Sequence, residues 1–466
     1  WLRIPYIHRL RDAIPHADGY CIFRSKWKMD SWLNDRKTIE KSIRPYAHFD
    51  SRTNIANVRQ YISNPQKVAK HGFYPFIHYE KNMDKFKKGK GKVEKRRDIC
   101  YAAHVDRCIY QYYSHLLNEL YNQRTDEDGI TKVAVAYRTN LGKSNIQFAK
   151  AAYDFIRESK DCYVMIGDFT HFFDNLCHAY LKKQWCSLLK CEKLPKDHYN
   201  VFKNITSYSK WELSDLLKIH GLSQKRNGRN ALNRLPRVLT KEQYNINRSQ
   251  IKPNLNHYGI PQGSPISGML ANLYMLEVDK NINELVKSYC GFYMRYSDDF
   301  MVVLPNSPNS EALNVFSKVR GFIADAPRLI LEPSKTQYFH YIGEKVENIG
   351  KEIDAEADGS KQFINFLGFM FDGKKIFLRK KTTSKYYYRM HRKAKAIARI
   401  GEYTKTGKHI NKTKLYMTYS DRGNNSRHSN FFTYVDRAEK EFGTDEDIRR
   451  DLKNPMGKIK KALEKR

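Results

Sequence analysis

The sequence lacks the patterns that mark zinc-binding cysteine pairs, membrane spans and secretion. Its eight Cys are scattered and none stands in a C-x-x-C pair, which argues against a zinc site. A chain of 466 residues does not depend on disulfides, so we expect reduced thiols and a cytoplasmic location. No run of about 18 apolar residues occurs and no signal-peptide core is present, so we expect no membrane partner. Because the chain begins at Trp1 rather than Met, we expect a segment to precede it.

Acidic residues are scarce relative to basic ones. The chain has 84 Lys and Arg against 50 Asp and Glu, which gives a formal net charge of +34. Such a surplus predicts a polyanionic partner, because each phosphate that a cation neutralises releases counterions. A general Lys bias would explain part of the excess but not its clustering. Aromatic residues make up 13% of the chain, including 32 Tyr, and their rings can stack on bases. The composition therefore favours a nucleic-acid partner.

Hydrophobic spacing predicts a mixture of helices and strands, with no internal repeat. Residues 81–97 hold nine basic and two acidic residues and predict a mobile basic loop, whose alternatives are a solvated charge run and an RNA contact. Residues 374–401 hold eleven basic residues and no acidic one, which is typical of a helix along a duplex backbone. We expect further helices over 98–122, 146–158, 176–189, 269–283 and 311–324, a largely helical insertion over 190–255, and strands over 73–79, 133–138, 162–168, 329–332 and 363–371.

Two adjacent carboxylates stand at the centre of one pattern. Short aromatic and β-branched segments, 291–295 and 301–305, flank Ser297-Asp298-Asp299 and predict a tight β-hairpin. Two carboxylates at a hairpin tip repel each other and lose hydration, a cost that a divalent cation would offset. Mg²⁺ takes a few carboxylate oxygens together with substrate phosphates. The alternative is a solvated Asp-Asp turn.

A third carboxylate follows an apolar run over 162–168, which ends at Asp168. If this strand neighbours the hairpin, Asp168 and Asp298 could hold two metals about 3.5–4 Å apart, as phosphoryl transfer requires. We expect the nearby His171 to be a turn or packing residue rather than a ligand. The pattern therefore predicts a two-metal site.

Two other segments could contact a nucleotide. The Gly- and Pro-rich loop 259–268 contains Gln262 and Gly263, and its backbone could approach a nucleotide closely at a helix start. A plain strand-to-helix loop is the alternative. Arg138 at the end of a predicted strand, with Lys143 on the next turn, could present two cations to a triphosphate.

Taken in order, these motifs resemble the palm motifs of reverse transcriptases. The matching series spans about residues 100–372: Asp168 with Phe173, then Pro261-Gln262-Gly263-Ser264-Pro265, then Tyr296-Ser297-Asp298-Asp299, then Lys335, then Phe366-Leu367-Gly368-Phe369. The resemblance implies an α+β fold, a right-hand polymerase with fingers, a palm of antiparallel sheet plus helices, and a helical thumb. It implies an N-terminal extension over 1–97, fingers over 98–160, a palm over 161–372 with a helical insertion at about 190–255, and a basic thumb and tail over 373–466.

The resemblance also implies residue roles. Asp168 and Asp298 would hold two Mg²⁺, for which Mn²⁺ could substitute, with Asp299 in support and the carbonyl of Phe169 joining them. Lys335 would protonate pyrophosphate. The ring of Phe173 would lie against the sugar and favour deoxynucleotides. The nucleotide would also be contacted by Arg138, Lys143, Gln262 and Gly263. The primer grip would be formed by Phe366, Leu367, Gly368 and Phe369, and nucleic acid would be contacted by Lys385, Arg389, Arg392, Lys393 and Lys395.

Tyr296-Ser297-Asp298-Asp299 with Gln262 to Ser267 resembles bacterial rather than retroviral enzymes. The Tyr-Arg-x-x-x-Gly-Lys-Ser segment at 137–144 and the long insertion after Asp168 are similar to abortive-infection and defence-associated reverse transcriptases. Those act against phage, often with a dedicated non-coding RNA, and some start DNA on a protein hydroxyl. An RNA template, a DNA product and dNTPs are the implied partners, and homo-oligomerisation stays open.

Other families fit the sequence less well. A retron enzyme would carry a Val-Thr-Gly triplet in the thumb, which is missing, and only about 95 residues follow Phe371, too few for the extra parts of a group II intron enzyme. A viral RNA-dependent RNA polymerase shares the palm, but Phe173 argues against it. An inactive palm that binds RNA is the alternative of another class, and the intact carboxylates argue against it.

Overall fold

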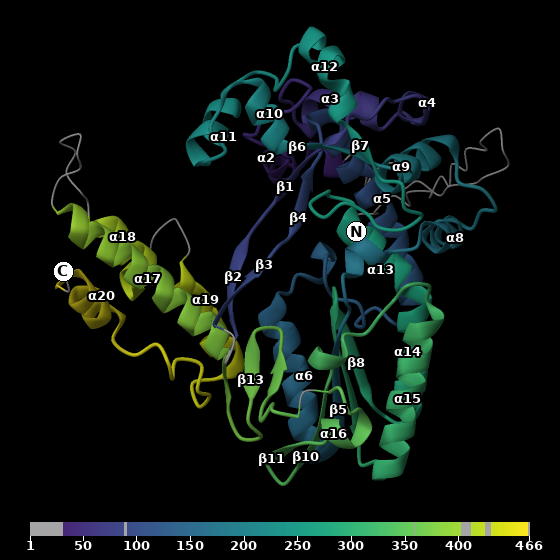
Figure 1. Cartoon of the computed structure of the whole chain (residues 1–466). Helices are drawn as coiled ribbons and strands as arrows, with labels where there is room; N and C mark the ends of the chain where they lie inside the picture. Colours follow the sequence, from purple (N-terminus) through teal and green to yellow (C-terminus); the bar gives the residue numbers. More distant parts are fainter. Residues whose placement is uncertain (1–30, 88–90, 358, 402–411, 425–429, 465–466) are drawn as a thin grey trace, which may run out of the picture. The chain divides into compact units, whose positions relative to one another are not determined.

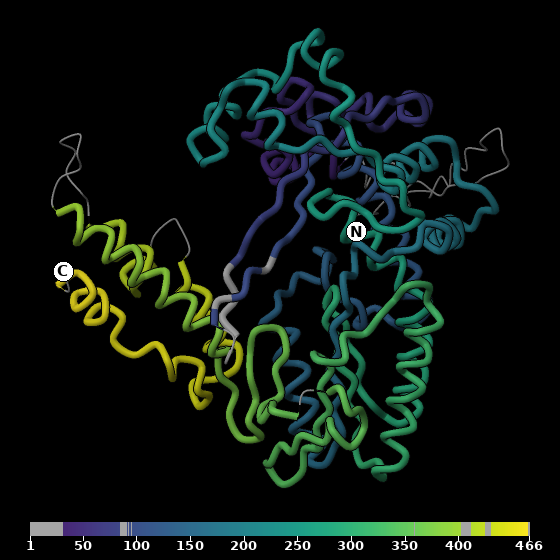
Figure 2. Tube along the Cα trace, viewed as in Figure 1, coloured from purple at the N-terminus to yellow at the C-terminus, as the bar shows by residue number. Residues whose placement is uncertain are grey.

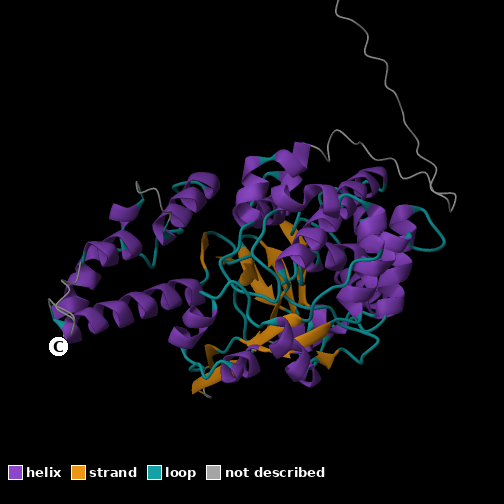
Figure 3. Ribbon diagram, turned by 90° about the horizontal axis from the view of Figure 1, so that it is seen from above, coloured by secondary structure: helices purple, strands orange, loops and turns teal. Residues whose placement is uncertain are grey.

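A computed structural model describes residues 31–87, 91–357, 359–401, 412–424 and 430–464 (Figure 1). The chain forms two compact units, each assembled from separated segments. The first unit is drawn from Trp1–Thr131, His171–Glu277 and Ala326–Leu329, and the second from Lys132–Thr170, Val278–Asp325 and Ile330–Arg466. Figure 2 lets the reader follow the chain as it passes between these segments. The sheets are mixed and helices are numerous, so the fold is α+β (Figure 3).

The second unit is built on a five-stranded antiparallel sheet in the order β11-β10-β5-β9-β8. Its central strand is buried from Cys162 to Gly167, because helices cover both faces. The side chains of Val164 and alternate neighbours pack in one core with helix α6, while Phe316 of helix α15 contacts Tyr338 on the opposite face. The bounds are β5 Asp161–Asp168, β8 Phe292–Tyr296, β9 Asp299–Pro305, β10 Gln337–Ile342, β11 Lys345–Asn348, α6 Asn145–Ser159, α15 Asn309–Asp325 and the short α16 Gly350–Ile353.

A small sheet and four helices complete the second unit. Helix α17, Lys380–Ile400, buries Met390, Ala394 and Ile397 at helical spacing against two other helices, and its basic residues face solvent. The predicted basic helix is therefore confirmed, but it starts at Lys380 because the residues just before it form a third strand. The other elements are β12 Ile364–Phe366, β13 Phe369–Phe371, β14 Ile376–Leu378, α18 Thr413–Tyr419, α19 Phe431–Phe442 and α20 Pro455–Glu464.

The first unit has a four-stranded sheet in the order β4-β1-β6-β7 and a set of helices around it. Trp211 on β6 is fully buried in its core, beside Ile77 on β1 and Leu216 on α10. The elements are α2 Arg36–Ser42, α3 Ile55–Ile62, α4 Pro65–Ala69, β1 Phe76–Glu80, β2 Met83–Lys87, β3 Gly91–Lys95, β4 Asp98–Tyr101, α5 His104–Glu127, α7 Phe172–Asn175, α8 His178–Leu189, α9 Lys196–Thr206, β6 Ser209–Glu212, α10 Leu213–Ile219, α11 Arg226–Leu232, α12 Lys241–Asn247, β7 Lys252–Pro253, α13 Ser267–Tyr274 and α14 Leu276–Ser288, which continues into the second unit.

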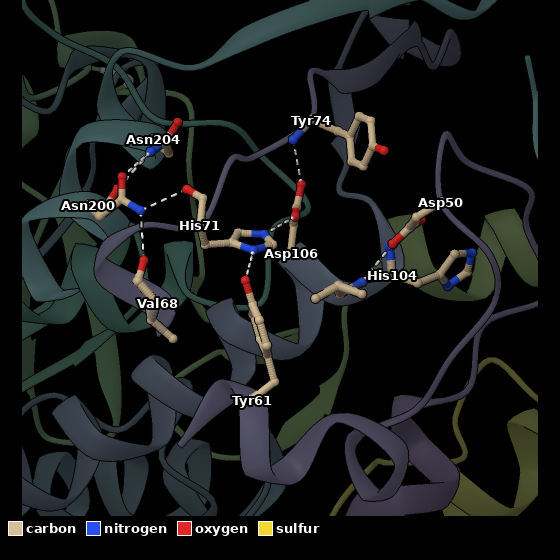
Figure 4. Close-up of polar contacts among 10 residues, drawn as sticks. Asp50, Tyr61, Val68, His71, Tyr74, His104, Asp106, Asn200 and Asn204 are labelled. Atoms are coloured by element: carbon tan, nitrogen blue, oxygen red, sulfur yellow. Dashed lines mark hydrogen bonds and ion pairs between the residues drawn. The ribbon is translucent and has the colours of Figure 1, made fainter. Parts of the chain in front are cut away.

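The start of helix α5 is anchored by two carboxylates, Asp50 and the buried Asp106 (Figure 4). Asp50 accepts hydrogen bonds from the backbone N–H groups of His104 and Val105, which caps the helix and explains why it begins there rather than at residue 98. Asp106 accepts from Tyr74 N and contacts His71, whose other ring nitrogen meets the hydroxyl of Tyr61 at 2.9 Å. Burial raises the pKa of Asp106, so these hydrogen bonds offset its desolvation.

Three predicted elements differ from the structure. Residues 81–87 and 91–97 are not a loop but continue the β1–β4 pair as the β2–β3 hairpin, since Lys81 and Arg97 exchange both backbone hydrogen bonds; residues 88–90 lie outside the described residues. The predicted strand 133–138 is reduced to one bridge, Ala134 to Arg295, because the chain turns at Tyr137 with a φ of 62°. Residues 329–332 likewise form only a bridge, at Leu331.

The remaining expectations hold with shifted ends. The helix predicted over 269–283 is interrupted at Met275, which separates α13 from α14. The 190–255 segment is largely helical as expected, with two short strands added. None of the described helices is long and apolar enough to cross a bilayer.

The contact between Gly167 and Phe300 gives a stability prediction. A Cβ at Gly167 would meet the buried Phe300 ring at 2.3 Å, so we expect Gly167→Ala to lower the free energy of unfolding by about 1–3 kcal/mol. Gly321 on α15 is the matched control, because a Cβ there meets nothing within 4 Å, and Gly321→Ala should raise it by about 0.5–1 kcal/mol. Urea unfolding of both variants measures the difference, and equal effects would contradict the packing argument.

Candidate active site

Backbone pairing brings the three predicted carboxylates together. Asp168 is the last residue of β5 and lies directly opposite Asp299, the first residue of β9, in the antiparallel register. Asp298 stands in the two-residue turn between β8 and β9, since Tyr296 pairs with Asp299. The predicted hairpin and the predicted strand ending in a carboxylate are therefore both confirmed as elements.

The electrostatics of this cluster show how costly it is. Burial, together with the charges of Asp298 and Asp168, raises the pKa of Asp299 to about 7. Arg379 and Lys335 act in the opposite direction but do not cancel the effect. A raised pKa at one of three neighbouring carboxylates shows that the cluster favours an added positive charge, such as a proton or a bound cation.

Lys335 supplies part of that positive charge. Its ammonium group forms an ion pair with Asp168 Oδ1 from the short 3-10 helix Pro333–Lys335. The segment is held at the end of β5 by two backbone hydrogen bonds, Thr170 N to Ile330 O and Glu332 N to Asp168 O. Lys335 thus lies beside one of the predicted carboxylates, and its role in protonating pyrophosphate stays a prediction.

The donor set fits a hard divalent cation. All candidate ligands are oxygens, from Asp168, Asp298, Asp299 and the carbonyl of Phe169, whose N–H donates to Asp298 O at 3.3 Å. Across the described residues, no three His, Cys, Asp or Glu side chains already form a complete ion site. Mg²⁺ takes one or two carboxylates and completes its coordination with waters or substrate phosphates, so this set of oxygens suits it.

Three of the nucleotide-contact candidates lie together in the first unit. Ile260 N donates to Phe173 O at 2.9 Å, and Gln262 Nε2 donates to both carboxylate oxygens of Asp174 at 3.2 and 3.3 Å. Cys100 N donates to Gln262 O at 2.8 Å, and a Cβ at Gly263 would lie 2.4 Å from Cys100 O. The Gly263 φ of 113° also requires glycine.

Asp174 and Cys100 are the partners that sequence reasoning missed. Asp174 follows Phe173 directly, so its position beside a nucleotide motif was the available signal. Cys100 gave no signal, because it contributes only its backbone.

The two predicted triphosphate cations differ in environment. Arg138 is 4% exposed and its Nη1 donates to Ala134 O at 3.1 Å, so its guanidinium is buried and hydrogen-bonded to the nearby backbone. Lys143 is exposed in the turn before α6. Both belong to the second unit with the carboxylates, and their contact with a triphosphate stays a prediction.

The predicted primer grip forms the turn between β12 and β13. Phe366 and Phe369 are buried and pair across the strands, while Leu367 and Gly368 turn the chain with φ values of 49° and 95°. The Gly368 carbonyl accepts from Arg379 N at 3.0 Å. Arg379, which no sequence motif singled out, thus joins this turn to the start of α17 and acts on the pKa of Asp299.

A basic pocket of about 990 Å³ opens beside α17, α18 and α19. Lys385 and Arg389, both predicted to contact nucleic acid, line it, whereas Arg392, Lys393 and Lys395 are exposed elsewhere on the helix. The other lining groups include the cations of Arg379, Lys381 and Lys414 and the rings of Tyr386, Tyr419 and Phe431. Cations beside aromatic rings suit a phosphodiester chain with unstacked bases.

The structure brings the carboxylates together on an antiparallel sheet, and a family comparison identifies the class of protein. Residues 86–371, more than half of the chain, match the model for reverse transcriptase (RNA-dependent DNA polymerase). The chain belongs to this family, whose domain is that of an RNA-directed DNA polymerase and whose members typically use a divalent metal. No curated protein matches the sequence.

Among solved structures, the chain is similar to telomerases of two yeasts. Apo telomerase of Candida tropicalis, truncated from its C-terminal domain, is 12% identical with a TM-score of 0.40, covering 70% of this chain and 61% of that one. Telomerase of Candida albicans with a fragment of telomeric RNA is 13% identical with a TM-score of 0.37, covering 88% and 58%. The chain therefore spans about six tenths of the length of these proteins.

The raised pKa of Asp299 gives a pH prediction. In buffer without divalent cations, protonated Asp299 contributes stability that is complete below about pH 4 and is lost as the pH rises through about 7, at most about 4 kcal/mol. Asp299→Asn should therefore remove this part of the pH dependence. Urea unfolding between pH 4 and 8 measures the free energy of unfolding, with Asp154→Asn on α6 as the control. Parallel pH profiles for the wild type and Asp299→Asn would refute the raised pKa of Asp299.

Proposed function

We propose that this chain is an active RNA-directed DNA polymerase that joins dNTPs by two-metal nucleotidyl transfer. The observation that carries the proposal is the register of β5 and β9, which sets Asp168 opposite Asp299 with Asp298 in the adjoining turn. These carboxylates and the Phe169 carbonyl would hold two Mg²⁺. When bound, the ions lower the pKa of the primer 3′-hydroxyl and neutralise the leaving pyrophosphate.

The chain's own residues would perform the remaining tasks. Lys335 forms an ion pair with Asp168, and we assign it to protonate the pyrophosphate as it leaves. Phe173 and Gln262 would contact the sugar and base of the incoming nucleotide, with Asp174 orienting the Gln262 amide. In this proposal the second unit's sheet is the palm and the helices from α17 onward are the thumb.

In this proposal, the basic pocket would bind the stretch of nucleic acid that leaves the carboxylates. Arg379 lies at the start of α17, where its charge acts on the pKa of Asp299. Lys385 and Arg389 follow along the same helix and line the pocket. A phosphate chain that left the carboxylates would therefore meet these cations in succession.

We further propose a role in antiphage defence, with a dedicated non-coding RNA as template. The support is the Tyr-Arg-x-x-x-Gly-Lys-Ser segment at 137–144 and the long insertion after Asp168, which resemble defence-associated bacterial enzymes. Sequencing the nucleic acid that copurifies with the wild-type protein and with Asp298→Asn tests whether the template is a dedicated RNA. We expect uniform DNA products only with the wild type, whereas random products would count against a dedicated template.

The Asp298→Asn variant also tests the polymerase assignment. We expect at least about a 10³-fold loss of DNA synthesis, because a metal-binding carboxylate supplies several kcal/mol and each 1.4 kcal/mol is tenfold. RNA binding, measured by filter retention, should persist, since the basic surface is unchanged. Asp161→Asn, at the other end of β5, is the control and should stay active. Full synthesis by Asp298→Asn would refute the metal assignment, whereas no synthesis by the wild type would leave the inactive RNA-binding module as the alternative.

Phe173 provides a test of sugar selection. We expect Phe173→Val to raise ribonucleotide incorporation about 10- to 100-fold, because the smaller side chain no longer excludes a 2′-hydroxyl. Phe173→Tyr keeps the ring and should keep the discrimination. Single-nucleotide primer extension with dNTPs and rNTPs measures the ratio. Equal use of both sugars by the wild type would favour an RNA polymerase instead.

A further inference from the structure

The hairpin turn that carries Asp298 adopts a backbone conformation that its sequence does not favour. Ser297 has a φ of 64°, in the left-handed region where two-residue turns usually place Gly or Asn. A non-glycine residue stays in such a conformation only when its surroundings hold it there. The contacts around Ser297 therefore show what fixes the direction of the next residue, Asp298.

One side of the turn is held by a buried ion pair. Arg295 and Asp279 are both fully buried, and Arg295 Nε and Nη2 contact the Asp279 carboxylate at 2.8 and 2.6 Å. The third nitrogen of the guanidinium, Nη1, donates to Ser297 O at 2.9 Å. A buried ion pair contributes little net stability but fixes direction well, because the planar guanidinium has a rigid set of donors.

The other side of the turn is held by Tyr137. Its hydroxyl is hydrogen-bonded to Ser297 Oγ at 2.8 Å, and its own φ of 62° is as unusual as that of Ser297. An aromatic residue in this region is a clear outlier, although its side chain is half-exposed. The hydrogen bond between the Tyr137 hydroxyl and Ser297 therefore forms although Tyr137 adopts an unfavourable backbone conformation.

The two supports meet at one residue. Arg295 N donates to Val133 O at 2.8 Å, and Val135 N donates to Arg295 O at 3.0 Å, so the segment that carries Tyr137 is fastened to the same Arg295 that holds the turn carbonyl. Residues 133–138, the turn and α14 are therefore linked through Arg295 in one rigid arrangement.

We propose that Tyr137 and Arg295 are positioning residues that hold Ser297 and thereby aim the Asp298 carboxylate at the ion site. This inference rests on the proposed function, since it gives these residues a role only if Asp298 binds a divalent cation. A purely structural role for Tyr137 would affect the stability of the fold and leave ion binding unchanged.

The test removes a single hydroxyl and measures ion binding directly. Mn²⁺ binding to the full chain, without template or nucleotide, is followed by electron paramagnetic resonance for wild type, Tyr137→Phe, Ser297→Ala and the double variant. We expect about fivefold weaker binding for each single variant, the factor that one ordinary hydrogen bond gives. The double variant should lose no more than either single one, because both remove the same bond.

Controls separate this effect from a loss of folding. Tyr341→Phe removes a hydroxyl from β10, opposite Cys162 at the far end of β5, and should leave Mn²⁺ binding unchanged. Thermal unfolding of Tyr137→Phe should resemble that of the wild type. Unchanged Mn²⁺ affinity in Tyr137→Phe, or a loss explained by a matching fall in melting temperature, would overturn the proposal.

One comparison distinguishes failure of the inference from failure of the proposed function. If Asp298→Asn binds Mn²⁺ as the wild type does, the carboxylates do not form the ion site, and the proposed function and the inference fail together. If Asp298→Asn loses binding while Tyr137→Phe and Ser297→Ala keep it, only the positioning role is refuted. Weakened binding in all three supports both.

Discussion

Repulsion among three carboxylates is the constraint on which the second unit depends. Asp168 and Asp299 are forced into proximity by the antiparallel register of β5 and β9, and burial then raises the pKa of Asp299 to about 7. Left to itself, such a cluster would move apart or take up protons. The sheet prevents the first outcome, because its central strands are buried under helices on both faces. The positive charges of Lys335 and Arg379 lower the pKa of Asp299 and so reduce its tendency to take up a proton.

Two residues with unfavourable backbone conformations meet at the turn between β8 and β9. Ser297 and Tyr137 both occupy the left-handed backbone region, and each is held by hydrogen bonds that a looser turn would not need. In the first unit, Gly263 shows the complementary solution, since the close approach of the Cys100 carbonyl leaves no room for a side chain. Contacts impose an unfavourable conformation on Ser297, whereas glycine avoids that cost at position 263.

Much of the fold could be predicted because its patterns are local. The apolar run ending at Asp168, the hairpin around Ser297 and the amphipathic basic helix each follow from residue spacing, and each is present. The errors have different causes. Residues 81–97 are charged enough to suggest a loop, yet 81–87 and 91–97 pair with each other and extend an existing strand pair. The strand-like 133–138 segment is instead bent by a single turn at Tyr137. Backbone pairing overrides composition in the first segment, and a local backbone conformation does so in the second.

Residue types and their spacing are enough to define the chemistry of the chain: the oxygen-rich motif set, the surplus of positive charge and the order of the motifs. These features can be read directly, because they depend on residue identity and position alone. Which side chains meet depends on the folded chain: Lys335 pairs with Asp168, Asp174 receives the Gln262 amide, and Arg295 joins Asp279 to Ser297. Such partners lie far apart along the chain or give no pattern of their own, so their meeting depends on strand register and on helix packing.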